Sequence, residues 1–428
     1  MESANDPNCD FPVANLPYGV FSHKSCPEDR RIGVAIGDKI LDLRAISQAH
    51  PSLFAERAPV EDASLKTLMS LGFEQRSAIR TTIRSLLIAG SSYNVEPFLV
   101  DMHDTQMHLP LDVGDYTDFY TSLDHATNVS RLFRPDSPQP PPNFYTMPLG
   151  YHGRASSIVV SGTSLVRPNG QILGPNGPLY GAIERLDYEM ELGVFIAEGN
   201  EQGSAIDIAD APSKLFGMVI LNDWSGRDVQ KWEYVPLGPF NAKNFATSIS
   251  PWVVTMEALE PYRVAGPQDP GSILPYLRPN VETAFDINVE VFVSSEAMRE
   301  KGIAPTLISR GNFSTMYWTL AQMLTHHTST GCNMRPGDLI GSGTISGPTR
   351  DSRGCLLEFL LPDGEPIILA DRTTRQFLQD GDEVILKAHA HKQGFPRIGF
   401  GECRGVVLPA KKALSATELS SARHEQLD

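Results

Sequence analysis

The feature of this chain that most restricts its fold is a run of three acidic residues at alternate positions in an apolar segment. Asp187, Glu189 and Glu191 alternate with apolar side chains across residues 186–195, LDYEMELGVF. This pattern predicts a β-strand, which places the three carboxylates on one face, about 6.5–7 Å apart. Such a cluster is costly unless a cation shares it, and the hard ions Mg²⁺ and Ca²⁺ prefer oxygen ligands. The alternative is a half-exposed strand with a solvated acidic face.

The charge of the chain argues against polyanionic partners. Its 428 residues predict two or three domains at roughly 150 residues per domain. The formal net charge is -15, and no run of lysine and arginine is longer than a pair. Nucleic acid and anionic membrane surfaces are therefore poor candidates. An anionic substrate would need a local cationic site or a metal ion.

The cysteines and the absence of long apolar runs predict a soluble cytoplasmic protein. The cysteines are odd in number and lack CxxC or other zinc spacing, which indicates reduced thiols. The first residues, MESANDPNCDFPV, have neither the basic region nor the apolar core of a signal peptide. The longest apolar runs fall far short of the roughly 18 residues of a membrane span.

Local patterns predict a small β unit, then helices, then a long strand-rich region. Gly37-Asp38 is a two-residue hairpin signal, and apolar residues at helical spacing predict a helix that includes Ile79 and Ile83. Arg76, Arg80 and Arg84 lie on one face of that helix and are interpreted as a solvated stripe. From Pro110 the chain becomes strand-rich, with one further helix predicted between residues 309 and 328. His389, on a predicted strand near the end, is interpreted as structural.

Two segments contain residues suited to catalysis. Residues 114–128 supply Asp118 and His125, and histidine can act as a base near neutral pH. Residues 216–221 predict a buried strand, and Asp223, directly after it, could add a ligand to the acidic strand. Arg227, Gln230 and Lys243 follow and could donate hydrogen bonds to oxyanions. The alternatives are a structural histidine and surface ion pairs.

Long motifs in these segments resemble the fumarylacetoacetase family. They are DFYTSLDHATN, LGYHGRASSIVVSGT, DYEMELGVF, NDWSGRDVQKWEYVPLGPF and RPGDLIGSGTISG. The resemblance covers most of the chain and is weaker over the first hundred residues. It implies a mostly β protein with some α: a small N-terminal SH3-like β-barrel domain with a helical extension over residues 1–112, and a large mixed β-sandwich and β-roll catalytic domain over residues 113–428.

The family resemblance also implies an activity. Members are homodimeric hydrolases that cleave a carbon-carbon bond of 4-fumarylacetoacetate, a diketo dicarboxylate, to give fumarate and acetoacetate, the last step of tyrosine and phenylalanine breakdown. Two rival interpretations are a metal-dependent decarboxylase or hydratase of the same scaffold and a non-catalytic dicarboxylate-binding protein. The pairing of His125 with Glu358 and the long N-terminal part argue against the first. The occupation of every catalytic position by a competent residue type argues against the second.

The resemblance further implies roles for individual residues. The implied ligands of Ca²⁺ or Mg²⁺ are Asp118, Glu189, Glu191 and Asp223, which leaves Asp187 outside the ligand set. A second cation would be met by Asp223, by Lys243 and by Thr247. His125 is the implied water-activating base, oriented by Glu358, and the oxyanion donors are Arg227, Gln230 and Lys243. The implied substrate-binding residues are Tyr120, Arg134, Tyr151, Gln230, Tyr234 and Thr344.

Two positions depart from the family pattern. Residue 226 is Gly where the family commonly has Ala, a change expected to free the backbone next to Arg227. Residue 246 is Ala where Gly is common. If that position needs a positive φ, its methyl group would strain the loop before Thr247.

Overall fold

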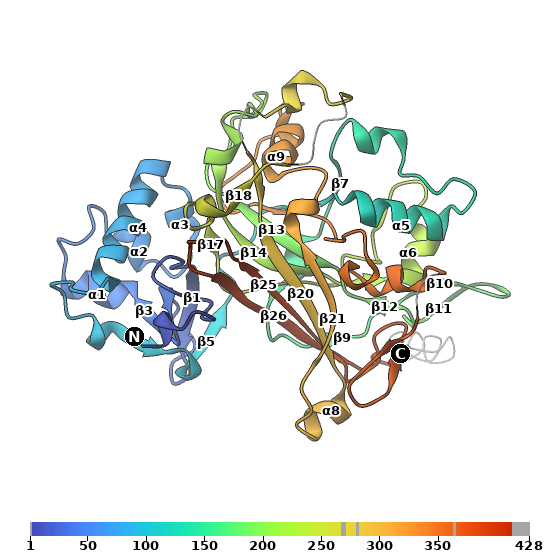
Figure 1. Ribbon diagram of the computed structural model, residues 1–428, viewed down its shortest axis with the longest axis horizontal. Helices are drawn as coiled ribbons and strands as arrows, with labels where there is room; N and C mark the ends of the chain where they lie inside the picture. The colour runs from blue at the N-terminus through green and yellow to red at the C-terminus, as the bar shows by residue number, and fades with distance from the viewer. Residues whose placement is uncertain (1, 267–270, 280–281, 363–364, 413–428) are drawn as a thin grey trace, which may run out of the picture.

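Two large β-sheets packed face to face, with a smaller N-terminal sheet beside them, form the framework of the protein (Figure 1). The computed structural model describes residues 2–266, 271–279, 282–362 and 365–412. Among the helices of these ranges, none has the length and apolarity needed to cross a membrane. The arrangement confirms the predicted fold class, mostly β with some α.

The N-terminal unit is a five-stranded antiparallel sheet with four helices, drawn in blue in Figure 1. Its strand order is β4-β3-β2-β1-β5, with β1 (Tyr18–His23), β2 (Arg31–Ile36), β3 (Lys39–Asp42), β4 (Leu99–Asp101) and β5 (Thr105–His108). The helices are α1 (Leu43–Ala49), α2 (Ala58–Glu61), α3 (Lys66–Met69) and α4 (Phe73–Leu87). Gly37, at φ 60°, turns β2 into β3 and confirms the predicted hairpin.

The central sheet has eight strands and carries the acidic residues. Its order is β7-β6-β22-β13-β14-β16-β8, and β17 also pairs with β14. The strands are β6 (Tyr116–Tyr120), β7 (Leu149–His152), β8 (Ile158–Val160), β13 (Met190–Ile196), β14 (Leu215–Asp223), β16 (Thr247–Ile249), β17 (Val254–Thr255) and β22 (Leu339–Gly341). Every residue of β14 is buried, as the apolar run predicts.

A five-stranded sheet covers one face of the central sheet, and short strand pairs and helices surround both. The order is β21-β20-β25-β26-β9, with β9 (Leu165–Val166), β20 (Ile287–Ser294), β21 (Thr306–Asn312), β25 (Glu383–Ala390) and β26 (Ile398–Leu408). The pairs are β10 (Asn169–Gly174) with β11 (Gly177–Ala182), β12 (Leu186–Asp187) with β15 (Ser225–Gly226), β18 (Arg263–Val264) with β19 (Ala284–Phe285), and β23 (Ile367–Ile368) with β24 (Thr374–Arg375). The remaining helices are α5 (Leu123–Phe133), α6 (Arg227–Glu233), α7 (Met256–Leu259), α8 (Glu296–Glu300) and α9 (Leu320–Thr328).

The central sheet is buried on both faces by two different cores. Leu192 and Ile220 point toward the five-stranded sheet and pack in one cluster with Val291. Alternate residues point the other way and pack against the N-terminal unit. This second cluster includes Phe195, Val219, Leu221 and Ile249 of the central sheet together with Val20, Ile32 and Val34. The predicted boundary between residues 112 and 113 falls between β5 and β6, and because this core crosses it, the division into two domains stays a prediction.

The predicted acidic strand is interrupted. Residues 186–195 were expected to form one strand, whereas Tyr188 and Glu189 separate β12 from β13. The Asp187 carboxylate accepts a hydrogen bond from the Tyr188 N–H at 2.9 Å, and this local bond competes with the regular ladder. The alternative of a half-exposed, solvated strand is wrong, because Asp187, Glu189 and Glu191 are all buried.

Of the helix predicted between residues 309 and 328, only the last nine residues are helical, as α9 (Leu320–Thr328). Residues 306–312 form β21, which pairs with β20, and α9 begins at Leu320. Thr319 caps α9 by accepting from the Gln322 N–H, while the Gln322 side chain accepts from the Thr319 N–H. The helical spacing of apolar residues before Thr319 was therefore coincidental.

The interpretation of the arginine stripe as solvated is wrong for two of its three members. Arg76 is buried and donates to the Leu71 and Ser213 carbonyls. Arg80 is half-buried and donates to the carbonyls of Ala14, Asn15 and Leu16. Arg84 alone is exposed. These bonds attach α4 to irregular backbone, whose carbonyls would otherwise lack partners.

Candidate active site

Four carboxylates from separate parts of the chain meet at one end of the central sheet. Asp118 lies in β6, Glu191 in β13 and Asp223 at the end of β14, while Glu189 precedes β13. One oxygen of each lies within 4.8 Å of one oxygen of every other, and all four side chains are buried. Both β6 and β13 pair with β22, and this shared neighbour in the sheet brings Asp118 close to Glu191.

Cationic and neutral donors satisfy one side of the cluster. Lys243 Nζ lies 2.5 Å from Glu189 Oε2 and 3.0 Å from Asp223 Oδ2. Tyr151 donates its hydroxyl to Asp223 Oδ2 at 2.8 Å, and the Gly343 N–H donates to Glu191 Oε2 at 3.0 Å. The other side is open: among the described residues, Asp118 Oδ1 and Glu191 Oε1 have no hydrogen-bond partner.

The cluster is short of positive charge. Burial, together with the Asp223 carboxylate, raises the pKa of Asp118 to about 8. Burial and the Asp118 carboxylate likewise raise the pKa of Glu191 well above its ordinary value. Burial alone would also raise the pKa of Glu189, but the Lys243 ammonium and the Arg227 guanidinium outweigh it and lower that pKa. The raised pKa values of Asp118 and Glu191 indicate that ionising all four carboxyl groups is costly unless another cation is present.

The residues fit a hard divalent cation. The donors are all oxygens, and two of them, Asp118 Oδ1 and Glu191 Oε1, are buried without a hydrogen-bond partner among the described residues. Gly341 leaves room for the carboxylates, since a Cβ there would lie 2.6 Å from Asp118 Oδ1 and 3.2 Å from Glu191 Oε2. Asp187 is not part of this group.

His125 and Glu358 form a buried pair near the acidic cluster. Ser122 caps α5 by accepting from the His125 N–H at 3.2 Å, which fixes His125 in the first turn. His125 Nδ1 lies 3.0 Å from Glu358 Oε2. Glu358 also accepts from Asn128 Nδ2 at 2.8 Å and Ser346 Oγ at 2.7 Å. Burial alone would raise the pKa of Glu358, but His125 and these donors lower it to about 2, so Glu358 is a carboxylate.

Arg227 bridges several acceptors and keeps one donor unused. It lies at the start of α6, donates from Nε to Asp187 Oδ2 at 2.8 Å, and pairs through Nη1 with Glu189 Oε1 at 2.7 Å. Nη1 also lies 2.9 Å from Gln230 Oε1, which leaves the Gln230 amide nitrogen to donate elsewhere. Arg227 Nη2 is buried and has no hydrogen-bond partner in the described part of the chain.

A cavity of about 590 Å³ joins these groups. Its wall contains Asp118 and Glu189 of the acidic cluster, the predicted base, the three predicted oxyanion donors and all the predicted substrate-binding residues: His125, Arg227, Gln230, Lys243, Tyr120, Arg134, Tyr151, Tyr234 and Thr344. Glu358 lies behind His125 and does not line the cavity. The structure therefore brings together the residues selected from the sequence, although their individual roles stay predictions.

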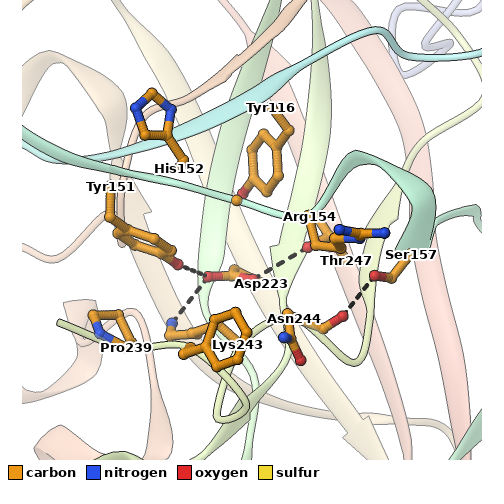
Figure 2. Close-up of a pocket in the computed structure, with 12 residues that line it drawn as sticks. Tyr116, Tyr151, His152, Arg154, Ser157, Asp223, Pro239, Lys243, Asn244 and Thr247 are labelled. Atoms are coloured by element: carbon orange, nitrogen blue, oxygen red, sulfur yellow. Dashed lines mark hydrogen bonds and ion pairs between the residues drawn. The ribbon is translucent and has the colours of Figure 1, made fainter. Parts of the chain in front are cut away.

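A second cavity, of about 360 Å³, is lined by Asp223 and shares Tyr151 and Lys243 with the wall of the first (Figure 2). Thr247, the predicted ligand of a second cation, lines it and donates to Asp223 Oδ1 at 3.2 Å. Asn244 and Ser157 meet in the same wall, as Figure 2 shows. Tyr116 also lines this cavity, and its buried hydroxyl has no hydrogen-bond partner among the described residues.

The two departures from the family pattern do not strain the backbone, and the freer backbone expected at Gly226 stays a prediction. Ala246 does not have a positive φ, so its methyl group does not strain the loop before Thr247. Gly226 has an ordinary φ of -91°. A Cβ at Gly226 would lie 2.5 Å from Ile183 Cδ1, so the missing methyl group makes room for Ile183.

Several residues that support the site were not singled out by sequence reasoning. Asn128 and Ser346 hold Glu358 but lie 230 and 12 residues from it in the chain. Gly343, at φ 77°, brings its N–H to Glu191, and a Cβ there would lie 2.2 Å from the Phe119 carbonyl oxygen. The only available signal was their presence inside the DFYTSLDHATN and RPGDLIGSGTISG motifs.

Comparison with known proteins identifies the family. Residues 14–110 match the family model "Fumarylacetoacetase N-terminal", and residues 116–408 match "Fumarylacetoacetate (FAA) hydrolase C-terminal". The fumarylacetoacetase of Rattus norvegicus is 47% identical over 411 residues, which cover 94% of this chain and 97% of the relative. The Homo sapiens enzyme is 46% identical with the same coverage, and that of Oryza sativa subsp. japonica is 44% identical over 419 residues, 94% of this chain and 96% of the relative.

A solved structure shares the fold at low sequence identity. The fumarylacetoacetate hydrolase from psychrophilic Exiguobacterium antarcticum has a TM-score of 0.51 and 18% identity, and the match covers 92% of this chain and 100% of that one. This likeness concerns the fold alone. The family models, which together span nearly the whole chain, and the relatives at 44–47% identity lead to one conclusion: the protein belongs to the fumarylacetoacetase family of hydrolases.

Proposed function

We propose that the protein hydrolyses a carbon-carbon bond of 4-fumarylacetoacetate to give fumarate and acetoacetate, the last step of tyrosine and phenylalanine catabolism. The observation that carries the proposal is one cavity wall that contains a buried histidine, two members of an acidic cluster and three hydrogen-bond donors. Cleavage of a β-diketone needs hydroxide attack at one carbonyl and departure of an enolate from the other. Both oxygens gain negative charge, so a base and oxyanion donors must face the same substrate.

His125 is the proposed base that takes the proton from the attacking water. Its Nδ1 faces Glu358 at 3.0 Å, which leaves Nε2 as the nitrogen available to water in the cavity. The ionised Glu358 would stabilise the imidazolium that forms, as the aspartate of a catalytic triad does, without a covalent nucleophile.

Arg227, Gln230 and Lys243 are the proposed oxyanion donors. Arg227 Nη2 is buried without a partner among the described residues, a costly state that a substrate oxygen would relieve. The Gln230 oxygen accepts from Arg227 Nη1, which leaves the amide nitrogen as the group that can donate to a substrate oxygen. Lys243 lines the cavity beside both.

The remaining wall residues are proposed to hold the substrate's own carboxylate and carbonyl groups. Arg134 lies at the end of α5, where its Nη2 donates to Ser130 Oγ, and is exposed enough to meet an incoming anion. The hydroxyls of Tyr120, Tyr151 and Tyr234 and the Thr344 side chain are further hydrogen-bonding groups of the wall.

Ca²⁺ or Mg²⁺ is the proposed cofactor, held by Asp118, Glu189, Glu191 and Asp223. When bound, such an ion polarises a diketone oxygen as a Lewis acid. Asp223 and Thr247, with the carbonyl of Lys243, are proposed to meet a second cation. Because the pKa of Asp118 is raised to about 8, binding near neutral pH should release protons. Calorimetric titration in two buffers of different ionisation enthalpy measures this release, and full activity in excess chelator would contradict the cofactor assignment.

Turnover of the purified protein tests the reaction itself. We expect the ultraviolet absorption of the diketone to disappear on mixing, with one fumarate released per substrate consumed. Release of carbon dioxide in place of fumarate would identify a decarboxylase instead. Binding of the diketone without loss of its absorption would identify a non-catalytic dicarboxylate-binding protein.

We further propose that the protein is a homodimer and is cytoplasmic. Several apolar side chains between residues 232 and 240 are exposed, with Leu237 at 94% and Phe240 at 67%, and a second copy would cover them. We expect Leu237→Asp to weaken self-association in analytical ultracentrifugation, while Ile88→Asp, at an exposed position on α4's C-terminal end, does not. All five cysteines are free thiols, as a reducing compartment allows. Cell fractionation tests the location.

A further inference from the structure

Asp187 connects two parts of the proposed active site that are far apart in the chain. Its carboxylate is fully buried and receives four hydrogen bonds. The donors are the Tyr188 N–H at 2.9 Å, the Leu356 N–H at 2.8 Å, the Leu357 N–H at 3.0 Å and Arg227 Nε at 2.8 Å. A buried carboxylate with this many donors is fully satisfied, so it does not itself need a metal ion.

The bond to Arg227 fixes the direction of the guanidinium. Asp187 holds the Nε edge, while Glu189 and Gln230 hold Nη1. Because the guanidinium is planar, two fixed nitrogens determine where Nη2 points. Nη2 is the atom that has no hydrogen-bond partner in the described residues.

The bonds to Leu356 and Leu357 fix the segment that contains Glu358. These N–H groups belong to the first turn of the short 3-10 helix η11 (Leu356–Leu360). The residue before that helix, Cys355, provides no side-chain cap. Asp187, about 170 residues earlier in the chain, accepts both N–H groups instead. Glu358 follows directly and reaches His125.

We propose that Asp187 is a positioning residue. It fixes the oxyanion donor Arg227 and Glu358, the carboxylate that orients His125, relative to each other. This role rests on the proposed function and goes beyond it, because Asp187 lies outside both the acidic cluster and the cavity wall. Asparagine at this position keeps the shape but offers one acceptor oxygen in place of two. Oδ1 accepts from Leu356 and Oδ2 accepts from Leu357 and Arg227, so the asparagine NH2 group must face at least one of these N–H donors.

A matched control exists elsewhere in the protein. Asp382 is also buried, pairs with Arg375 at 2.7 Å and accepts from the Gln379 N–H at 2.8 Å. None of these three residues lines the large cavity. Asp382→Asn therefore removes a similar buried pair without touching the site. We expect both variants to lose thermal stability. Only Asp187→Asn should lower kcat per folded molecule, by about 10²–10³-fold as for loss of an oxyanion donor, with KM changed less than about threefold.

A double-mutant cycle separates positioning from general stabilisation. If Asp187 acts partly through Glu358, the loss of kcat in Asp187→Asn/Glu358→Gln should be at least about tenfold smaller than the product of the two single losses. The cycle of Asp382→Asn with Glu358→Gln should be additive. Additive effects for Asp187, or a kcat within about threefold of the parent, would overturn the proposal.

Hydrogen exchange gives a readout that does not depend on turnover. At least one of the amides of Leu356 and Leu357 should exchange faster in Asp187→Asn than in the parent or in Asp382→Asn, because they donate to different oxygens of Asp187 and asparagine keeps only one acceptor. Unchanged exchange there would refute the connection to η11 even in an inactive protein. A parent that does not cleave the diketone would instead refute the proposed function and leave this structural result readable.

Discussion

His125 is fixed at two points, by the cap of α5 at its backbone and by Glu358 at its ring. At the scale of single residues, we predict that His125→Ala lowers kcat by about 10²–10⁴-fold, the usual contribution of a general base. Cation affinity should stay within about threefold, since His125 is not part of the acidic cluster. Steady-state kinetics and calorimetry measure both. His389→Gln, on β25, is the matched control, and near-normal turnover of His125→Ala would refute the assignment.

The Glu358 carboxylate should make stability depend on pH. Its pKa falls from 4.5 to about 2 on folding, since His125, Asn128 and Ser346 outweigh burial. A depressed pKa contributes stability above pH 4.5, about 3 kcal/mol, and this contribution is lost as the pH falls toward 2. Glu358→Gln cannot ionise and lacks that contribution.

The difference in unfolding free energy between parent and Glu358→Gln should therefore be largest above about pH 5 and shrink toward pH 2–3. Urea denaturation across that range measures it. Glu56→Gln, at an exposed position, serves as the control. A difference that is constant with pH would contradict an ionised Glu358.

Single residues were predictable from the sequence where a long motif surrounds them. His125, Asp118 and Asp223 stand in such motifs, and the structure brings them to one site. The supporting contacts were not predictable in this way. Asp187 was grouped with the acidic strand, yet its partners lie at Arg227 and in η11, and a hydrogen bond across so many residues leaves no local pattern.

At the scale of elements, the N-terminal cap of α9 can be tested by itself. The Thr319 hydroxyl accepts from the Gln322 N–H and also from the Thr283 hydroxyl. We predict that Thr319→Ala lowers the free energy of unfolding by about 1 kcal/mol, the usual cost of losing such a cap. Thr319→Ser keeps the hydroxyl and should cost much less. Chemical denaturation of both variants decides the point, and equal losses would exclude the cap as the cause.

Helices and strands were predicted correctly where a short stretch of sequence carries a clear signal. The β2–β3 hairpin and the buried β14 follow from Gly37 and from an unbroken apolar run. The helix predicted over 309–328 was correct from Leu320 on and wrong before it, because apolar spacing cannot reveal that residues 306–312 pair with β20. The arginine stripe was wrong because the carbonyls that receive Arg80 come from residues 14–16, in a different part of the chain.

At the scale of the whole molecule, we predict that residues 113–428 do not fold alone. Removal of the N-terminal unit would expose Phe195, Phe216, Leu221 and Ile249 on one face of the central sheet. An uncovered apolar sheet face of this kind favours aggregation. Expression of the fragment should give insoluble protein, and co-expression with residues 1–112 should restore solubility. A soluble, active fragment would instead support two independent domains.

The fold class was predictable from strand content and family motifs, but the arrangement of the sheets was not. The parallel pairing of β6 with β22 joins Asp118 to Gly341 across more than two hundred residues, and that pairing brings Asp118 to Glu191. The sequence also did not predict which face of the central sheet the N-terminal unit covers. Both depend on long-range contacts that only the folded chain specifies.

The doubly covered central sheet has a consequence for inherited variation. A substitution such as Val34→Asp lies in the N-terminal unit, yet its side chain belongs to the same core as Leu221, two residues before Asp223. Such a change would reduce how much enzyme a cell retains and leave the chemistry of each surviving molecule intact. Harmful alleles are therefore expected well away from the catalytic centre, and compounds that favour the native state could rescue that group.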